Sequence, residues 1–175
     1  TPVFNADREV NSIYKTNREC FKKLNSKFPL FIKSFPVKKK ELIATINDNS
    51  KNLKKISSIV HPLVRTKMRN FLKKNKKSKI IVLDIPLLIE NKLFKKKDIL
   101  IFVNSKKEKV INRLKKRKNY DKKILKNLKE NQVNLSKKRK LANYIVDNNF
   151  SPNTMKKKIK ILKYKILNER NSIRH

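Results

Sequence analysis

Polar side chains with a possible chemical role lie just after the hydrophobic runs of the sequence. The carboxyl ends of parallel strands form the edge at which open α/β sheets bind ligands, so acids placed there can contact and orient a ligand. The chain has only 13 acidic residues among 175, so their position after such runs is informative. Each acid could instead cap a helix or form a surface ion pair. The candidates are Asp7, Asp84, Glu90, Asp147 and Asn148.

Two short segments are more distinctive than the rest. In VLDIPLLIEN (82–91), Asp84 follows a hydrophobic run that Pro86 ends abruptly, so we expect Asp84 to face the ligand crevice. The pair His61-Pro62 is embedded in a hydrophobic helical pattern. A single histidine in such a pattern is more often a capping or core residue than a catalytic one.

The elements that must position these residues alternate between strands and helices. Short apolar runs predict strands at 3–5, 79–85, 98–103 and 143–148, the second and third of them buried on both faces. Helical spacing predicts helices at 7–27, 38–48, 50–75, 106–117, 121–132 and 151–170. We expect a loop at 28–36 and a loop or short helix at 86–94. This alternation is typical of an α/β fold with a parallel sheet.

The predicted helix boundaries depend on a few residues. Ser50, Ser105, Asp121 and Ser151 are placed to cap the helices that follow them, and Pro152 suits a first helical position. Pro62 lies inside the 50–75 pattern, so we expect two helices or a kink there.

The net charge of +36 first suggests a nucleic-acid partner, because Lys and Arg bind phosphates by releasing counterions. However, Lys, Asn and Ile fill 81 of the 175 positions, and all three have A/T-rich codons. The basic residues are spread along the chain and do not alternate with aromatic residues, as a base-stacking surface would require. We therefore favour a solvated basic surface over a polyanion partner, which stays an alternative.

Several classes of site are disfavoured by composition. The single cysteine, Cys20, excludes a disulfide framework and a cysteine-based zinc site, and two histidines, His61 and His175, do not suit a histidine-rich metal site. No apolar run approaches the roughly 18–20 residues of a membrane span. The start of the sequence carries no signal-peptide pattern, so we expect a cytosolic protein with no metal site in these residues.

The sequence contains no glycine at all. Glycine averages about 7% of protein residues, so roughly a dozen would be expected in a chain of this length. Glycine-dependent devices such as the dinucleotide-binding fingerprint and the phosphate-binding loop are therefore absent from these residues. Because the sequence also begins without Met, we expect that a segment carrying such a device has been removed.

Taken together, the motifs resemble the dephospho-CoA kinase family. The matching pieces in chain order are FNAD (4–7), IVHPLVR (59–65), VLDIPLLIEN (82–91), INRLKKR (111–117), Gln132 and LANYIVDNNFS (141–151). The resemblance covers nearly all of the chain. It implies a single P-loop kinase domain over 1–175, with a parallel sheet flanked by helices and a helical lid at about 106–140.

The resemblance also implies a reaction and roles for named residues. The reaction would move the γ-phosphoryl group of ATP, bound with Mg²⁺, to the ribose 3′-hydroxyl of dephospho-CoA in the last step of coenzyme A biosynthesis. Asp7 would be the base or orienting group for that hydroxyl, and Arg113 and Arg117 would stabilise phosphate charge from one face of a lid helix. The residues on the dephospho-CoA side would be His61, Arg65, Asp84 and Glu90, and Asn148 would lie near the adenine of ATP.

The sequence departs from the family pattern at several places. Asn5 replaces the first Asp of the DAD motif, Asn143 replaces the Asp of an AD pair, and Lys138 stands where the family often has Arg. The largest departure is the missing G-x-x-x-x-G-K-[ST] loop and the first strand before it. With a strand order of 2-3-1-4-5, the chain would supply strands 2 to 5 around an empty central position, leaving two interior edges unpaired. We therefore expect a truncated kinase that is inactive and unable to fold stably by itself.

Two other functions stay open at this point. A different P-loop kinase acting on a nucleotide or related metabolite would share the fold, but the combination of PLL-x-E and HP-x-x-R favours dephospho-CoA. A basic RNA- or DNA-binding protein would leave the apolar strands and the crevice acids unexplained. Nothing in the sequence predicts an oligomeric state.

Overall fold

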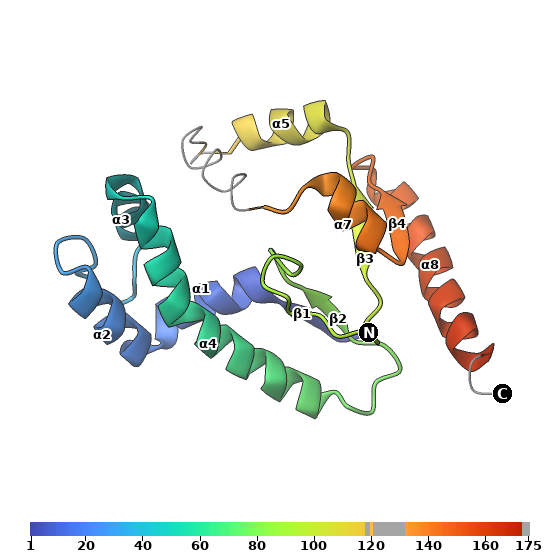
Figure 1. Ribbon diagram of the computed structural model, residues 1–175, viewed down its shortest axis with the longest axis horizontal. Coiled ribbons are helices and arrows are strands. Elements are labelled where there is room, and N and C mark those ends of the chain that lie inside the picture. The colour runs from blue at the N-terminus through green and yellow to red at the C-terminus, as the bar shows by residue number, and fades with distance from the viewer. Residues whose placement is uncertain (118–119, 121–131, 173–175) are drawn as a thin grey trace. The chain divides into compact units, whose positions relative to one another are not determined.

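The computed structural model describes residues 1–117, 120 and 132–172 (Figure 1). The chain divides into two compact units, Thr1–Leu88 and Ile89–His175. Because each unit has its own strands and helices, the two are described separately. The predicted helix from Asp121 to Gln132 falls outside the described residues, except for Gln132 itself, and so does a large part of the predicted lid.

The first unit begins with the predicted strand and helices. Its elements are β1 (Val3–Asn5), α1 (Ala6–Thr16), α2 (Arg18–Lys27), α3 (Lys39–Asp48), α4 (Lys51–Lys74) and β2 (Val82–Asp84). The helix predicted over 7–27 is divided at Asn17, whose backbone is extended (φ −96°, ψ 99°). Its side chain accepts a hydrogen bond from the Cys20 amide at 2.7 Å, which caps α2. The capping bond explains why a second helix starts there.

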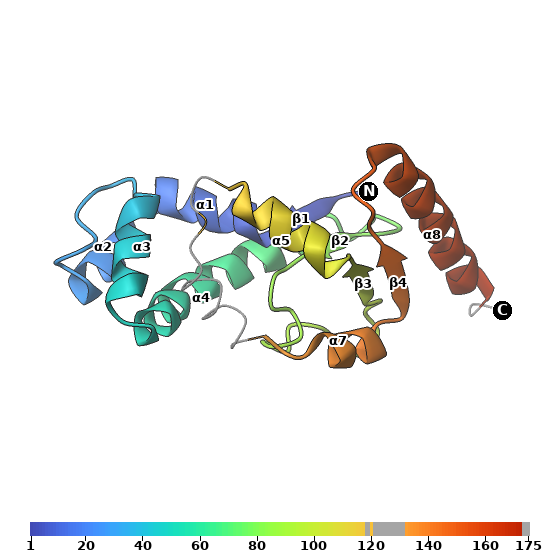
Figure 2. The same cartoon turned by 90° about the horizontal axis from the view of Figure 1, so that it is seen from above.

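The core of the first unit lies between α4 and the three helices before it. Figures 1 and 2 show α2 and α3 gathered near the N-terminal end of α4, while α1 lies beside it. At the other end, Phe4 of β1 packs against Phe71 of α4, with ring centroids 5.5 Å apart. The buried hydrophobic cluster consists of Ile13, Cys20, Leu24, Phe28, Ile32, Val37, Ile56 and Val60.

The long helix α4 differs from the prediction in two ways. It continues without interruption through Pro62, so the prediction of two helices is wrong. Apolar residues on both sides of the proline, such as Val60 and Leu63, belong to the same packed cluster, and this shared burial outweighs the lost backbone donor. Ser50 makes no side-chain capping bond; Asn49 Oδ1 instead accepts a hydrogen bond from the Lys51 amide at 2.9 Å.

The second unit contains β3 (Ile101–Asn104), α5 (Lys107–Lys115), α7 (Leu135–Leu141), β4 (Tyr144–Asp147) and α8 (Pro152–Ser172). Figure 2 shows α8 beside β4, where Lys158 Nζ donates to the Asp147 carbonyl at 2.8 Å. The helix α8 begins at Pro152, as predicted. The prediction that Ser105 caps the helix that follows it is wrong, because α5 starts one residue later than predicted, at an N-cap of Lys106 that makes no side-chain capping bond.

The strands form two parallel pairs. In the first, Val3, Phe4 and Asn5 of β1 lie opposite Val82, Leu83 and Asp84 of β2. In the second, Ile101 to Asn104 of β3 lie opposite Tyr144 to Asp147 of β4. These are the neighbours expected from the order 2-3-1-4-5 without its first strand, so the parallel α/β character is confirmed. The strands of the described residues form two small sheets.

Neither β2 nor β3 is buried on both faces, which corrects the prediction from their apolar runs. Val82 is 39% exposed, and Ile101 and Val103 are 44% and 56% exposed. Both strands are also shorter than predicted. The reason is that each lies in a two-stranded sheet in the described part of the chain, so each has an edge without a neighbouring strand.

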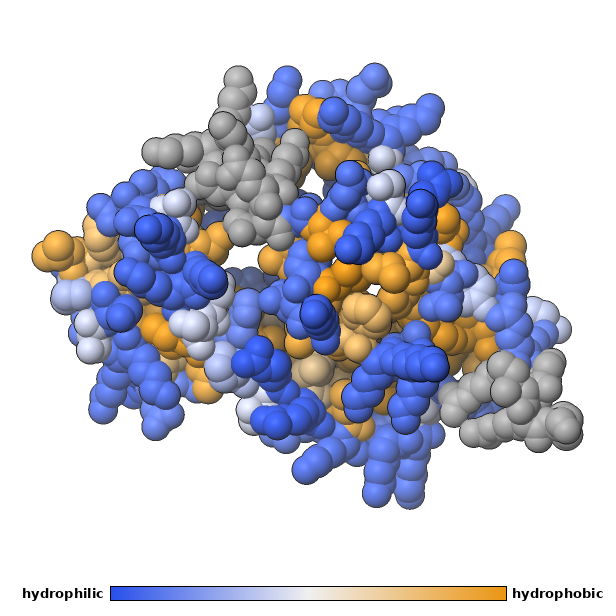
Figure 3. All heavy atoms as spheres, viewed as in Figure 1, coloured by the Kyte–Doolittle hydropathy of each residue, from blue (hydrophilic) through white to orange (hydrophobic). Residues whose placement is uncertain are grey.

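Hydrophilic side chains cover much of the face seen in Figure 3, with hydrophobic atoms visible between them. This agrees with basic residues spread along the whole sequence. Within the described residues, none of the helices has both the length and the apolar character needed to cross a membrane.

Candidate functional site

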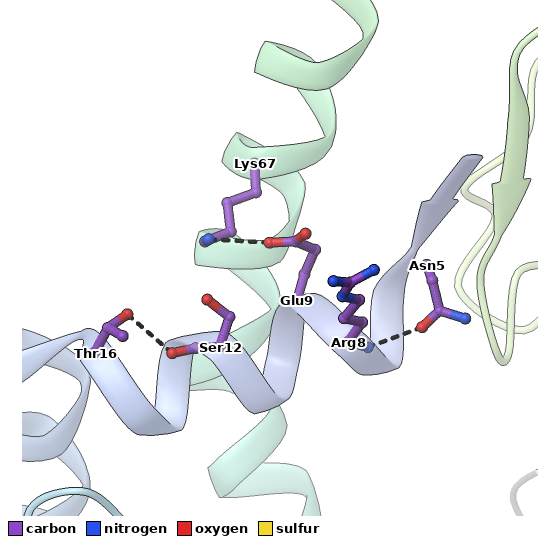
Figure 4. Close-up of polar contacts among 6 residues, drawn as sticks. All are labelled: Asn5, Arg8, Glu9, Ser12, Thr16 and Lys67. Carbon is purple, nitrogen blue, oxygen red and sulfur yellow. Dashed lines mark hydrogen bonds and ion pairs between the residues drawn. The ribbon is translucent and has the colours of Figure 1, made fainter. Parts of the chain in front are cut away.

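At the carboxyl end of the first sheet, the last residues of the two strands form an amide–carboxylate hydrogen bond. Asn5 and Asp84 are the last residues of β1 and β2 and lie opposite each other in the register. Asn5 Nδ2 donates to Asp84 Oδ2 at 2.6 Å, and Asn5 Oδ1 accepts from the Arg8 amide at 2.8 Å (Figure 4). The Asn5 side chain therefore caps α1 and holds the Asp84 carboxylate at the same time.

Asp7 lies in the first turn of α1, immediately after this pair. The exposed N–H groups of a first helical turn favour a carboxylate there. Glu9, two residues on, forms an ion pair with Lys67 of α4 at 2.9 Å and so fixes α1 to α4 (Figure 4). Asp7 is exposed and its carboxylate makes no hydrogen bond or ion pair with the described residues, which leaves the carboxylate available to a ligand.

His61 and Arg65 lie one turn apart on α4. His61 is half-buried and Arg65 is exposed. Burial lowers the pKa of His61, and the charge of Arg65 lowers it further, so the neutral imidazole is favoured at neutral pH. No hydrogen bond or ion pair among the described residues joins these two side chains to Asp7 or Asp84.

The second sheet ends in the same way as the first. Asn104 and Asp147 are the last residues of β3 and β4, and Asn104 Nδ2 donates to Asp147 Oδ1 at 2.6 Å. At the opposite end of β4, Asn143 Oδ1 accepts from the Leu100 amide at 2.8 Å. Asn143 therefore helps to align β4 with β3, and an aspartate carboxylate could accept the same bond.

The loop after β4 brings two of the predicted ATP-side residues together. Asn148 Oδ1 accepts a hydrogen bond from the Phe150 amide at 2.8 Å. The Arg113 guanidinium of α5 lies over the Phe150 ring, 4.7 Å from its centroid. Arg113 and Asn148, which are 35 positions apart in the sequence, are thus connected through one aromatic residue.

Arg117 lies beyond the end of α5, so the helix predicted over 106–117 is two residues too long at this end. The helix α5 ends at Lys115, and the Arg117 amide donates to the Leu114 carbonyl at 3.0 Å in the turn that follows. The four-residue helical spacing from which a shared face with Arg113 was predicted therefore does not extend to Arg117.

The Glu90 carboxylate is bonded to two other groups of the protein, the Lys138 ammonium and the Val133 amide. Its Oε1 lies 2.5 Å from Lys138 Nζ of α7 and accepts the Val133 amide at 2.9 Å. Burial alone would raise the pKa of the Glu90 carboxyl, but the bonds from Lys138 and from backbone amides outweigh it and lower the pKa. Lys138 supplies the cation of this pair, where the resemblance led us to expect Arg.

Three features of the site were not foreseen from the sequence. They are the Asn5 amide bonded to Asp84, the Lys138 partner of Glu90 and the Phe150 ring beneath Arg113. Only the first left a signal, because Asn at a strand end before a helix is a typical N-cap. The described residues also contain no cluster of three or more His, Cys, Asp or Glu that could hold a metal ion.

Comparison with known proteins assigns a family to this arrangement. A sequence model described as dephospho-CoA kinase matches residues 1–153. A dephospho-CoA kinase of Wolbachia pipientis is 30% identical over 151 residues, which cover 85% of this chain and 77% of that protein. One from Bartonella henselae is 33% identical over 148 residues, covering 83% of this chain and 75% of that protein.

Solved structures support the same fold. The dephospho-CoA kinase of Campylobacter jejuni matches with a TM-score of 0.63 at 21% identity, covering 97% of this chain and 86% of that one. A crystal structure of a protein from Thermus thermophilus matches with a TM-score of 0.68, also at 21% identity, over 94% of this chain and 84% of that one. The family match over 153 residues is what fixes the assignment: the chain belongs to the dephospho-CoA kinase family of phosphotransferases.

Proposed function

We propose that this chain carries the substrate-binding and lid residues of a dephospho-CoA kinase. The observation that supports the proposal most directly is the family match over residues 1–153, which spans every candidate site residue. In the reaction, the ribose 3′-oxygen of dephospho-CoA bonds to the γ-phosphorus of ATP as the bond to the β,γ-bridging oxygen breaks. The products are CoA and ADP, and one proton leaves the hydroxyl. Mg²⁺ enters with ATP as part of the substrate complex.

Asp7 is the residue that receives or orients the hydroxyl proton. Its carboxylate is exposed at the start of α1 and has no partner among the described residues, unlike Glu9, which is bound to Lys67. A carboxylate that orients the nucleophile is a recurring part of phosphoryl-transfer sites. The Asn5–Asp84 bond fixes the strand ends from which α1 begins, so it supports the position of Asp7.

The other predicted residues divide between the two substrates. His61, Arg65 and Asp84 contact dephospho-CoA, for which the exposed guanidinium of Arg65 supplies a phosphate partner. Glu90 also belongs to the dephospho-CoA side. Its carboxylate is bonded to Lys138 and to the Val133 amide, so its role is to hold those residues in place.

On the ATP side, Arg113 and Arg117 stabilise charge on the transferring phosphoryl group, and Asn148 lies near adenine. Both arginines are exposed, and no carboxylate among the described residues pairs with either. Their positive charges are therefore available to a phosphate.

A phosphate-binding loop must complete this site, and a sequence without glycine cannot contain G-x-x-x-x-G-K-[ST]. We therefore expect the 175 residues alone to be inactive. The test compares them with a loop-joined protein, in which a strand–loop–helix segment bearing that motif precedes Thr1. Formation of CoA is followed by chromatography and formation of ADP by a coupled assay.

The loop-joined protein should form CoA and ADP in equal amounts from dephospho-CoA and ATP. Replacing the Lys of the joined loop with Ala is the matched control and should abolish turnover. Folded loop-joined protein that phosphorylates a nucleoside monophosphate but not dephospho-CoA would contradict the proposal and favour another metabolite kinase.

A further inference from the structure

The backbone of Phe150 adopts a conformation that bulky residues rarely take. Its φ angle is 65°, in the left-handed region where a side chain with a Cβ crowds the backbone. Strained residues persist only where their surroundings hold them, and they concentrate at functional sites. Phe150 lies in the short loop between β4 and α8, next to Asn148.

Two contacts hold Phe150 in place, and each reaches a residue of the proposed ATP side. The backbone amide of Phe150 donates to Asn148 Oδ1 at 2.8 Å. Its ring lies beneath the Arg113 guanidinium at 4.7 Å. The backbone of Phe150 therefore forms a hydrogen bond with Asn148, while its ring forms a cation–π contact with Arg113.

An aromatic partner suits an arginine that must bind phosphate. A carboxylate would neutralise the guanidinium and occupy its N–H donors, which are the groups that bind phosphate oxygens. The face of a ring attracts the cation without removing its charge. Arg113 is exposed and forms no ion pair with the described residues, so the ring is the contact that restrains it.

We propose that Phe150 is a positioning residue that holds the Arg113 guanidinium ready for the phosphates of ATP. This inference rests on the proposed function and adds to it a role for Phe150, to which the resemblance assigned none. A ring contact reduces the rotamers open to a long side chain, so less entropy is lost when the guanidinium binds phosphate.

The experiment uses the loop-joined protein with four substitutions. F150Y keeps the ring, F150L keeps apolar volume without a π face, and F150G removes the side chain and relieves the backbone strain. All three keep the backbone amide that donates to Asn148, so none of them removes that hydrogen bond directly. Y164L, an aromatic-to-leucine change at a 70% exposed position of α8, is the matched control.

We expect kcat/KM for ATP to fall about two- to fivefold in F150L and in F150G, the range that an exposed cation–π contact supports. F150Y and Y164L should keep wild-type values, and KM for dephospho-CoA should not change. F150G should melt no lower than F150L because glycine accepts the φ angle without strain. Activity that simply follows the melting temperature across the set would overturn the proposal.

A double-mutant comparison in the Arg113→Ala protein tests whether Phe150 acts through Arg113. If Phe150 acts through Arg113, F150L lowers kcat/KM no further in the R113A protein. An equal additional loss there would show that Phe150 acts by another route and would overturn the inference.

A spectroscopic measurement separates this inference from the proposed function. In NMR spectra of the loop-joined protein, the Phe150 ring should shift the Arg113 side-chain protons upfield, and the shift should disappear in F150L and persist in F150Y. If the protein fails to phosphorylate dephospho-CoA, the proposed function fails while this contact is still decided by the spectra. Arg113 protons at ordinary positions in the wild type would refute the positioning role.

Discussion

The ion pair between Glu90 and Lys138 allows a quantitative prediction. The side chains are 10% and 17% exposed, respectively, and the joined atoms are 2.5 Å apart. Exposed pairs contribute about 0–1 kcal/mol, and breaking a fully buried pair costs about 3–5 kcal/mol. Glu90→Gln removes the charge but keeps an oxygen for the Val133 amide, so we expect a loss of about 1–2 kcal/mol.

Glu90→Ala should cost more, about 2–4 kcal/mol, because it leaves both the Lys138 ammonium and the Val133 amide without their acceptor. The assay is urea denaturation of the loop-joined protein at neutral pH. Glu9→Gln is the matched control: Glu9 and Lys67 are 30% and 41% exposed, so the change should cost about 0.2–1 kcal/mol.

The same pair gives a pH dependence of known sign. The pKa of Glu90 is lowered in the folded protein, so folding favours the ionised carboxylate. Its contribution is complete above the ordinary glutamate pKa of about 4.3 and is lost as the pH falls through the lower folded value. The difference between wild type and Glu90→Gln should therefore shrink as the pH is lowered from about 7 towards 3.

Two results would refute this reasoning. One is a stability of Glu90→Gln within about 0.5 kcal/mol of wild type at neutral pH, which is the range of ordinary surface changes. The other is a difference that stays constant through the acid range, because the lost term would then not be the carboxylate charge.

Three further predictions concern the first unit and the lid. Asp7→Asn should lower kcat of the loop-joined protein about a hundredfold or more while leaving dephospho-CoA binding measured by calorimetry nearly unchanged; near-normal turnover would remove Asp7 from the mechanism. Arg117→Ala should lower kcat/KM for ATP about tenfold. An effect no larger than that of Lys116→Ala would show that Arg117 is an ordinary solvated surface residue with no specific role in binding phosphate. Asn5→Asp keeps the oxygen that caps α1 but places a second carboxylate next to Asp84. The melting temperature of this variant should therefore be lower than wild type at neutral pH and should recover towards about pH 5. Asn5→Ala should have a low melting temperature at both pH values. Parallel pH curves for the two Asn5 variants would show that the carboxylates do not interact.

Local patterns in the sequence predicted most of the elements because their causes are local. Strand positions, the loop at 28–36, the helix at 38–48 and the start of α8 at Pro152 follow from apolar periodicity and capping residues. The parallel pairing of β1 with β2 and of β3 with β4 followed from the expected strand order. The unbroken α4 could not be predicted in the same way, because packing of its apolar face decides whether Pro62 ends the helix.

The sequence led us to propose a set of site residues but not the contacts that they make. Asp84, Glu90 and Arg113 have partners that come from distant parts of the sequence. Glu90 and Lys138 are 48 positions apart, and no periodicity relates residues on separate elements. Such pairs depend on tertiary packing, so a single sequence cannot reveal them.

The absence of glycine has a structural cost that falls at the proposed site. In the part of the chain that the structure describes, three residues have positive φ, namely Leu87, Lys92 and Phe150, and glycine would take these conformations without strain. Leu87 and Lys92 flank Glu90 in the turn after β2, and Phe150 follows Asn148 in the loop after β4. Both loops follow the strand that ends in an acid bonded to asparagine, Asp84 in one sheet and Asp147 in the other. A composition bias acting alone would place such residues at any turn of the chain. Among the described residues, positive φ is restricted to these two loops, so both turns require a left-handed residue even though no glycine supplies it.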